Sequence, residues 1–190
     1  MLCVWLLSNR ILTCLISRVS ISLSRIDRCL VNDGSSGHRR AKLTFAAALR
    51  GHGNGDKRAR LERFHRPYHA ALGELIAAAQ PRLILSLHSF TPQLATSAEK
   101  RPWEVALLYN QDDRAARHAI RLFREQGLTV GDNEPYSGTQ LNATMDRHAE
   151  AQGIPYCLVE IRQDQVANEA GQARWAMMLA DVMGRVALEV

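Results

Sequence analysis

The chain has 190 residues, of which 46% are hydrophobic and 23% are charged. This is the balance of an ordinary soluble globular protein, and it excludes a mainly disordered chain, a collagen-like fibre and a coiled coil. The four cysteines, at positions 3, 14, 29 and 157, show neither CxxC pairing nor dense spacing. They therefore predict neither a disulfide scaffold nor a structural zinc site, and we expect a reduced, cytoplasmic setting.

The net charge of +5 is concentrated in the first third of the chain. Residues 1–60 hold 11 Lys or Arg against 3 Asp or Glu, whereas residues 61–190 hold 13 against 16. A nucleic-acid-binding protein gathers its basic side chains on one folded face, beside groups that read or stack on bases. The basic stretch at 39–60 lies among Gly, Ser, Asn and His instead, so we expect no nucleic-acid partner.

The first residues are apolar but are interrupted by charge. The run at 2–7 is followed by Arg10 and Arg18, whereas a transmembrane helix needs roughly 20 mostly apolar residues. The order of charge and apolar residues is not that of a signal peptide either. We therefore expect no membrane partner and a short buried strand or a poorly folded leader here. Residues 1–55 are predicted to be an atypical basic leader, and residues 56–190 to form the folded domain.

Regular patterns begin after Asp56. Apolar residues at helical spacing predict a helix over 61–79, which Pro67 either kinks or divides. The patterns that follow predict strands over 83–87, 103–109, 128–130 and 156–161, and helices over 113–126 and 168–188. Strands that alternate with helices predict an α/β fold, a three-layer sandwich whose central sheet is mostly parallel or mixed.

Ligands of such sheets gather at the carboxyl ends of the strands. His88 follows the strand 83–87, where an imidazole can bind a water-activating metal or serve as a hydrogen-bonded structural group. Glu160 lies within the apolar strand 156–161, where burial raises a carboxyl pKa toward the range of a general base. The alternative for Glu160 is an ion pair with Arg162, which shares its face of the strand.

Two loops offer groups that can bind an anion. Asn133 and Tyr136 lie in the polar loop after the third predicted strand, and both can donate hydrogen bonds to a carboxylate or oxyanion without adding charge. Arg101 precedes a proline and can clamp a carboxylate with two hydrogen bonds. A simple turn and a solvated arginine are the alternatives.

Other catalytic schemes have less support. His65 and His69 share a helical face, but no acidic residue stands between them in an HExxH arrangement, which favours a packing or surface role. The sequence contains no GxSxG elbow, P-loop or GxGxxG motif. Cys157 lies in an apolar strand, without the basic neighbours that lower a thiol pKa.

Five motifs follow one another in the last two thirds of the chain. They are Arg63–Leu72, Ser86–Pro92, Arg101–Trp103, Gly131–Ser137 and Glu160–Asp164. Together, and in this order, they resemble the N-formylglutamate amidohydrolase family. The similarity runs from about Asp56 to the end of the chain.

The resemblance implies a zinc-dependent amidohydrolase with a fold like that of the zinc carboxypeptidases. Such enzymes release formate from N-formyl-L-glutamate, late in histidine breakdown, or hydrolyse related N-acyl amino acids, so the implied partner is a small acidic N-acyl amino acid. By motif, His88 matches a zinc ligand and Glu160 matches the general base that takes a proton from zinc-bound water. By position, Arg101, Asn133 and Tyr136 are candidates to hold the substrate's carboxylates.

Residues 1–55 depart from the family pattern. Family members supply a further zinc-binding His and an acidic residue from an amino-terminal segment, and these residues have no recognisable counterpart here. Because a catalytic zinc needs three protein ligands, we expect an incomplete zinc site in a truncated or frame-disrupted member. The alternative is an inactive pseudo-enzyme that binds an acidic amino acid derivative or a partner protein. A missing first strand would also leave a sheet edge exposed.

Overall fold

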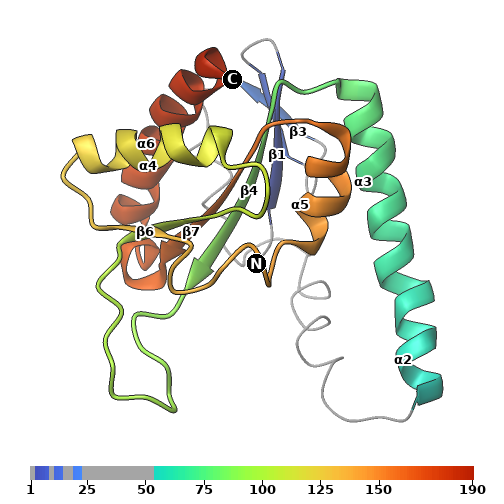
Figure 1. Ribbon diagram of the computed structural model, residues 1–190, viewed down its shortest axis with the longest axis horizontal. Helices are drawn as coiled ribbons and strands as arrows, with labels where there is room; N and C mark the ends of the chain where they lie inside the picture. Colours follow the sequence, from blue (N-terminus) through green and yellow to red (C-terminus); the bar gives the residue numbers. More distant parts are fainter. Residues whose placement is uncertain (1–2, 9–10, 15–18, 23–53) are drawn as a thin grey trace. The chain divides into compact units, whose positions relative to one another are not determined.

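The computed structural model describes residues 3–8, 11–14, 19–22 and 54–190 (Figure 1). They fall into two compact units. One unit contains the sheet and joins the first strands to the chain from Ala79 onward, and the other contains the helices before Ala79. The predicted boundary between a leader and a domain near residue 55 stays a prediction.

A mixed sheet forms the centre of the first unit. Within the described residues it has seven strands in the order β3-β2-β1-β4-β7-β5-β6. Strands β4 and β7 pair in parallel, as do β5 and β6, while the other neighbours are antiparallel. The strands are β1 (Cys3–Ser8), β2 (Ile11–Cys14), β3 (Val19–Ser22), β4 (Leu83–Phe90), β5 (Val105–Leu108), β6 (Val130–Asp132) and β7 (Tyr156–Arg162).

Helices cover both faces of this sheet. They are α4 (Arg114–Glu125), α5 (Ala143–His148) and α6 (Glu169–Glu189), with short 3₁₀ turns η3 (Glu150–Gln152) and η4 (Gln163–Val166). Helices α4 and α6 lie together on one face, where the rings of Phe123 and Trp175 are 6.2 Å apart, and α5 lies on the other side (Figure 1). The predicted α/β sandwich with a mixed sheet is therefore confirmed.

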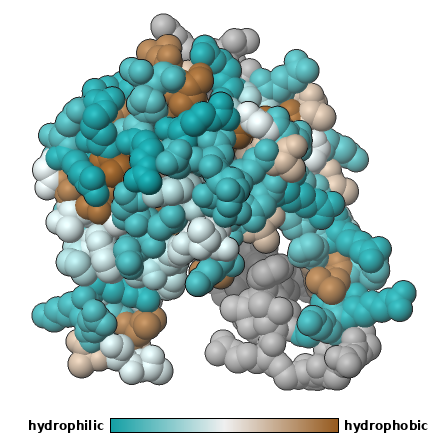
Figure 2. Space-filling view, viewed as in Figure 1, coloured by the Kyte–Doolittle hydropathy of each residue, from teal (hydrophilic) through white to brown (hydrophobic). Residues whose placement is uncertain are grey.

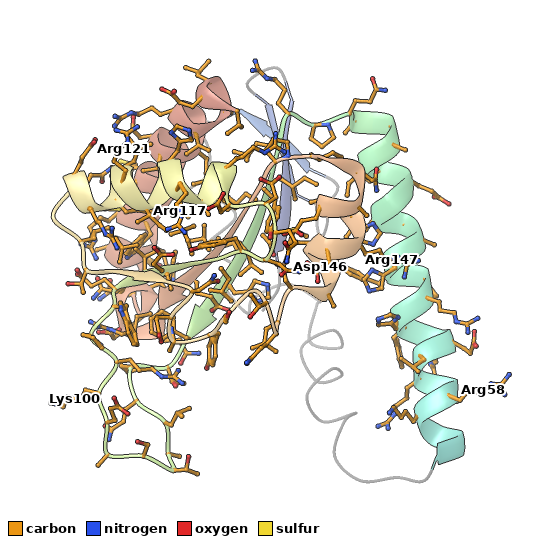
Figure 3. The ribbon with its side chains drawn as sticks, viewed as in Figure 1. Arg58, Lys100, Arg117, Arg121, Asp146 and Arg147 are labelled. Atoms are coloured by element: carbon orange, nitrogen blue, oxygen red, sulfur yellow. The ribbon has the colours of Figure 1, made fainter. Side chains whose placement is uncertain are left out.

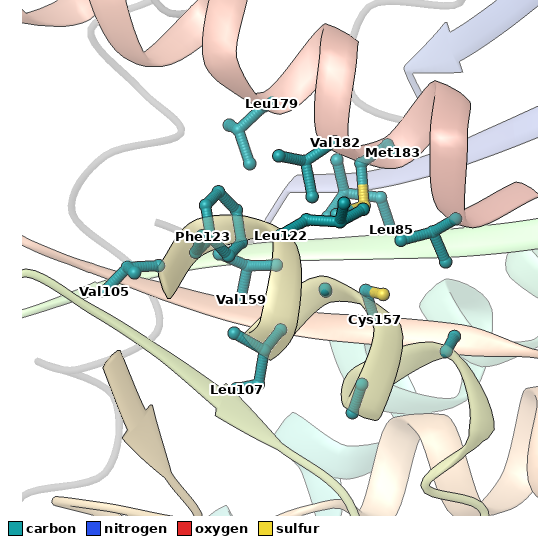
Figure 4. Packing of buried hydrophobic residues seen from close by; sticks show 14 of the residues in the cluster. Leu85, Val105, Leu107, Leu122, Phe123, Cys157, Val159, Leu179, Val182 and Met183 are labelled. Carbon is teal, nitrogen blue, oxygen red and sulfur yellow. The ribbon is translucent and has the colours of Figure 1, made fainter. Parts of the chain in front are cut away.

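The main core lies between the sheet and the α4–α6 layer (Figure 4). Alternate residues of the two central strands point into it, and they are fully or almost fully buried: Leu83, Leu85 and Leu87 of β4 with Cys157, Val159 and Ile161 of β7. Since successive side chains of a strand point to opposite faces, the residues between them face away from this core. His88 and Glu160 belong to that second set.

Helix α4 shows how the outer layer separates apolar from charged residues. Ile120 and Phe123 are buried against the sheet, whereas Arg117 and Arg121 project outward (Figure 3). Figure 2 shows a largely hydrophilic surface over this helix. Arg117 pairs with Asp132 at 2.7 Å, and Arg121 pairs with a glutamate one turn along at 2.7 Å, so these cations are neutralised within the chain.

The second unit contains one helical segment in three parts: α2 (Asn54–Arg60), a π-helical turn η2 (Leu61–His65) and α3 (Arg66–Ala79). The predicted helix over 61–79 is confirmed and begins earlier than predicted. Pro67 lies in the first turn of α3, where a missing amide hydrogen is tolerated. The π-helical turn η2 precedes Pro67 and is closed by a hydrogen bond from the amide of Arg66 to the carbonyl of Leu61. None of the helices in the described ranges combines the length and apolar character that crossing a bilayer requires.

Some element boundaries differ from the prediction. Strand β4 continues to Phe90 because its pairing with β7 extends that far, so His88 lies inside the strand and not after it. Strand β6 begins at Val130, since the amide of Leu128 still bonds the carbonyl of Phe123 at the end of α4. Helix α5 and strands β2 and β3 were not predicted, because segments of four to six residues show no clear periodicity.

Candidate functional site

His88 and Glu160 lie side by side on the sheet face that is turned away from the main core. They occupy facing positions on the parallel strands β4 and β7. His88 Nδ1 is 3.9 Å from Glu160 Oε1. The pairing of these two strands therefore brings together the two residues that the sequence indicates as the reactive pair.

The Glu160 carboxyl is buried and only partly satisfied. It is 8% exposed, and its Oε2 atom has no hydrogen-bond partner among the residues that the structure describes. Burial raises its pKa to about 7, and the positive charge of Arg101 offsets this only in part. The predicted alternative partner, Arg162, instead pairs with Asp164 at 2.7 Å. Near neutral pH, Glu160 is thus able both to accept and to release a proton.

The His88 ring is uncharged at neutral pH. Burial lowers its pKa to about 4, so its 3.9 Å approach to Glu160 is not an ion pair at pH 7. A neutral imidazole has one ring nitrogen with a free lone pair, which can accept a hydrogen bond or bind a metal.

Arg101 is held in place by aromatic rings and hydrogen bonds, unlike a solvated loop arginine. Its Nη1 donates to the hydroxyl of Tyr136 at 3.0 Å and to the carbonyl of Thr91 at 3.3 Å. Its guanidinium lies 5.0 Å from the ring centre of Tyr136 and 5.9 Å from that of Phe90. The structure therefore brings two of the predicted anion-binding residues, Arg101 and Tyr136, into direct contact.

Asn133 shapes the loop that presents Tyr136. It adopts the left-handed backbone conformation, with φ of 55°, and its Oδ1 accepts hydrogen bonds from the amides of Tyr109 at 3.0 Å and Gly138 at 2.9 Å. Its predicted contact with substrate stays a prediction. The backbone amide of Asn133 donates to the carbonyl of Leu107, so the side-chain nitrogen Nδ2 is the donor left for such a contact.

A cavity of about 430 Å³ joins the reactive pair to Tyr136. Its floor is the sheet face around His88 and Glu160, and its wall runs from Gln140 to Met145, across the end of the preceding loop and the first turn of α5. The lining residues are Ser86, His88, Leu108, Tyr136, Gln140, Leu141, Asn142, Ala143, Thr144, Met145, Leu158 and Glu160. Arg101 and Asn133 are not among them.

Ser86 and Asn142 were not predicted as cavity residues. Ser86 could have been found, because it precedes His88 by two positions on the same strand face. Asn142 gives no signal in the sequence. Its Nδ2 donates to Asp146 at 2.6 Å and to the hydroxyl of Tyr156 at 2.8 Å, and the Tyr156 hydroxyl donates to Glu150 at 2.6 Å. This network ties the start of α5 to strand β7.

The described residues do not by themselves fit a catalytic zinc. Such a zinc takes three protein ligands and keeps one position open. His88 and Glu160 lie together, but among the described residues no group of three or more His, Cys, Asp or Glu side chains is placed to bind a metal. One histidine and one carboxylate do not complete a zinc site.

The remaining sequence candidates have local structural roles. In the second unit, His65 and His69 contact each other, with Nε2 atoms 3.1 Å apart. Cys157 is fully buried in the core, and burial raises the pKa of its thiol. A protonated, inaccessible thiol is no nucleophile.

The sequence model of the N-formylglutamate amidohydrolase family matches residues 29–167. The chain belongs to this family. The match includes the stretches around His88, Arg101, Tyr136 and Glu160, and it confirms the resemblance found in the sequence motifs.

Solved structures of the family resemble the chain. A gene product from Agrobacterium tumefaciens is 30% identical, with a TM-score of 0.64 over 71% of this chain and 55% of that one. An N-formylglutamate amidohydrolase from Ralstonia eutropha is 25% identical, with a TM-score of 0.54 over 70% of this chain and 55% of that one. No curated protein is similar enough to count as a match. The chain thus corresponds to just over half the length of these two relatives.

Proposed function

We propose that this chain is an N-formylglutamate amidohydrolase-like hydrolase, which cleaves the C–N bond of N-formyl or other N-acyl amino acids. The observation that carries the proposal is the Glu160 carboxyl. It is buried beside His88 in a cavity, its Oε2 has no partner within the described part of the chain, and its pKa is about 7. Family membership supports the same reaction.

Glu160 is proposed to act as both base and acid. Its ionised form accepts a proton from water as the water oxygen attacks the acyl carbon. Its protonated form then gives this proton to the leaving amide nitrogen, so the C–N bond breaks to yield a carboxylate and a free amino acid. A pKa near the operating pH serves both steps.

Arg101 and Tyr136 are proposed to bind the substrate's carboxylate. Arg101 supplies a fixed positive charge. Because the Tyr136 oxygen accepts a hydrogen bond from Arg101, its own hydrogen remains available for donation to an anion. Asn133 supports this pair through the loop that it shapes.

Zinc stays a prediction from the family motifs, with His88 as its ligand, because the described residues do not complete a metal site. No step above depends on it. The resemblance also suggests a place in histidine breakdown, and the cysteine pattern suggests a reduced, cytoplasmic setting. Both are part of the proposal.

The second candidate is a binding protein without turnover. The incomplete ligand set among the described residues favours it, since such a cavity can still bind an acidic amino acid derivative. Arg101 and Tyr136 would serve binding in the same way, so turnover and not affinity distinguishes the two candidates.

Formate release from N-formyl amino acids tests the proposal, with and without added zinc and with the zinc content measured. We expect release by the unaltered chain and a loss of at least about 100-fold in Glu160→Gln, which cannot shuttle the proton. The exposed Glu99→Gln makes the same charge change outside the cavity and should retain activity. Binding without any release would reject the hydrolase in favour of the binding protein.

A further inference from the structure

Arg162, at the end of strand β7, uses all three nitrogens of its guanidinium in hydrogen bonds. Its Nε and Nη2 donate to the two carboxylate oxygens of Asp164 at 2.7 and 3.0 Å. Its Nη1 lies 3.1 to 3.2 Å from three successive backbone carbonyls, those of Arg101, Pro102 and Trp103. The Arg162 side chain is only 16% exposed, so these bonds hold the guanidinium in one place.

The three carbonyls that share this donor fix the path of the backbone just before β5. Residues 101–103 are neither helix nor strand, so their carbonyls are not paired by a neighbouring strand. Because partly buried carbonyls need a donor, the Arg162 guanidinium takes the place of such a strand. The amide of Arg162 also donates to the carbonyl of Glu104 at 2.9 Å. Arg162 thus attaches the whole approach to β5 to the end of β7.

Arg101 lies at the start of this segment, and its side chain reaches the candidate site. Its carbonyl is held by Arg162, and its amide donates to the carbonyl of Pro92 at 2.9 Å. From this anchored backbone, its Nη1 contacts the hydroxyl of Tyr136 at 3.0 Å and the carbonyl of Thr91 at 3.3 Å. A side chain of this length has many rotamers, so the place of its guanidinium depends on where its backbone is fixed.

We infer that Arg162 and Asp164 are positioning residues for substrate binding: Asp164 orients the Arg162 guanidinium, and Arg162 holds the backbone that places Arg101 beside Tyr136. This inference rests on the proposed function, in which Arg101 binds a substrate carboxylate. Arg162 and Asp164 are not among the residues that line the cavity. Their effect therefore passes through Arg101 and falls mainly on affinity, because a small displacement of a binding group weakens the complex.

A double-mutant cycle tests whether Arg162 acts through Arg101. The probe is N-formyl-L-glutamate, and its affinity is measured by calorimetric titration in the Glu160→Gln chain, where binding is observed without turnover. We expect Arg162→Gln to weaken binding at least about tenfold. In a chain that already carries Arg101→Met, the same substitution should change the affinity less than about twofold, since no guanidinium is left to position. With Glu160 intact, KM for formate release should rise while kcat changes less.

Asp164→Asn is a milder variant that keeps Arg162 in the chain. Asp164 is 46% exposed, so its substitution should not prevent folding. It removes the charge that orients the guanidinium and should weaken binding about threefold, again only while Arg101 is present. If urea unfolding shows that Arg162→Gln does not fold, the cycle of Asp164→Asn with Arg101→Met decides the question.

Arg114→Gln is the matched control. Arg114 also forms a two-bond pair with an aspartate two residues away, Asp112, at 2.9 and 2.7 Å, and it donates to the carbonyl of Gly153 at 3.2 Å. It does not contact the segment that carries Arg101 in any of these bonds. Its substitution removes the same kind of interaction, so the affinity for N-formylglutamate should stay unchanged.

The possible results separate the inference from the proposed function. Equal losses from Arg162→Gln with and without Arg101 would overturn the inference, as would unchanged affinity in Arg162→Gln and Asp164→Asn. Formate release by the unaltered chain would leave the hydrolase intact in both cases. Losses that depend on Arg101, in a chain that binds but releases no formate, would uphold the positioning role and reject the hydrolase. Failure of N-formylglutamate to bind and to react would overturn both.

Discussion

At the scale of single residues, His88 and Glu160 have pKa values displaced in opposite directions by the same cause. Burial disfavours the charged form of each, so the histidine pKa falls from 6.5 to about 4 and the glutamate pKa rises from 4.5 to about 7. Between about pH 4 and pH 7, both side chains are therefore mostly uncharged in the folded chain. The cavity therefore holds a neutral pair at its base, which suits a residue that must exchange protons with water.

These displacements predict how stability depends on pH. Between about pH 4.5 and 7 the folded chain holds a Glu160 proton that the unfolded chain has released, so this contribution to stability is lost as pH rises. Between about pH 6.5 and 4 the unfolded chain protonates His88 and the folded chain does not, so that contribution is lost as pH falls. Where these two pH ranges overlap, the two contributions to the free energy of unfolding change with pH in opposite directions.

Single variants should separate the contributions of Glu160 and His88 to the pH dependence of stability. Relative to the unaltered chain, Glu160→Gln should gain free energy of unfolding as pH rises from 4.5 to 7, on the order of 3 kcal/mol in total. His88→Gln should gain as pH falls from 6.5 to 4, by a smaller amount because this ring is 31% exposed. Urea unfolding at pH 4 to 8 measures both differences. If the difference in free energy of unfolding between each variant and the unaltered chain did not change with pH, the displaced pKa values would be contradicted.

At the scale of elements, the short helix α5 is fixed by polar contacts more than by its own propensity. Six residues are too few for a stable isolated helix. The hydroxyl of Tyr156 accepts hydrogen bonds from Asn142 Nδ2 and the amide of Asn110, and it donates to Glu150. One oxygen atom on β7 thus connects α5, η3 and the loop after β5.

Removal of this hydroxyl should loosen the cavity wall. We expect Tyr156→Phe to lower the free energy of unfolding by about 2 kcal/mol, since it leaves buried donors and an acceptor unpaired, and to speed hydrogen exchange in α5. Tyr136→Phe removes a hydroxyl that is only half-buried and should cost less than about 1 kcal/mol. Equal losses in the two variants would show that the network at Tyr156 has no special role.

The loop that carries Tyr136 depends on a close backbone approach at Gly138. A Cβ at this position would lie 2.3 Å from the carbonyl oxygen of Tyr109, and backbone cannot give way as a flexible side chain does. Gly138→Ala should therefore cost about 2 kcal/mol or more and weaken substrate binding. In Gly184→Ala of α6, the added Cβ meets no atom of the described residues within 4 Å, so this variant should be neutral or stabilising by up to about 1 kcal/mol. Urea unfolding measures both variants. A loss of stability in Gly138→Ala alone would show a steric effect at this position, whereas equal losses in both variants would contradict it.

The sequence predicts the elements whose pattern repeats and misses those that depend on distant partners. Helices α4 and α6 were predicted to within a residue or so, because several apolar positions recur in each. The proximity of His88 and Glu160 followed from their places on two apolar strands. Asn142 could not be predicted, because it becomes important only through its bonds to Asp146 and Tyr156. The same holds for the role of Asn133, which is set by backbone amides across the loop.

At the scale of the whole molecule, the two faces of the sheet have different roles: one packs into the main core and the other carries the candidate site. One face is packed under α4 and α6, while the opposite face contains the reactive pair and the cavity. The central strands β4 and β7 serve both faces, so a change that shifts their register would move His88 and Glu160 apart as well as disturb the core. Strand β1 pairs along the other edge of β4 and covers the edge that a missing first strand would leave open.

Deletion of residues 1–22 should therefore change the association state. Without β1, the backbone amides and carbonyls of β4 from Leu83 to Leu87 lose their antiparallel partners. Strand β4, still paired with β7 on its other side, then becomes an exposed edge strand, which is a template for pairing with another chain. We expect the shortened protein to form dimers or larger assemblies at concentrations where the intact chain sediments as a smaller species. Analytical ultracentrifugation of both proteins measures this difference. Identical sedimentation would mean that β4 needs no cover from β1, and that the antiparallel pairing contributes little to keeping the chains apart.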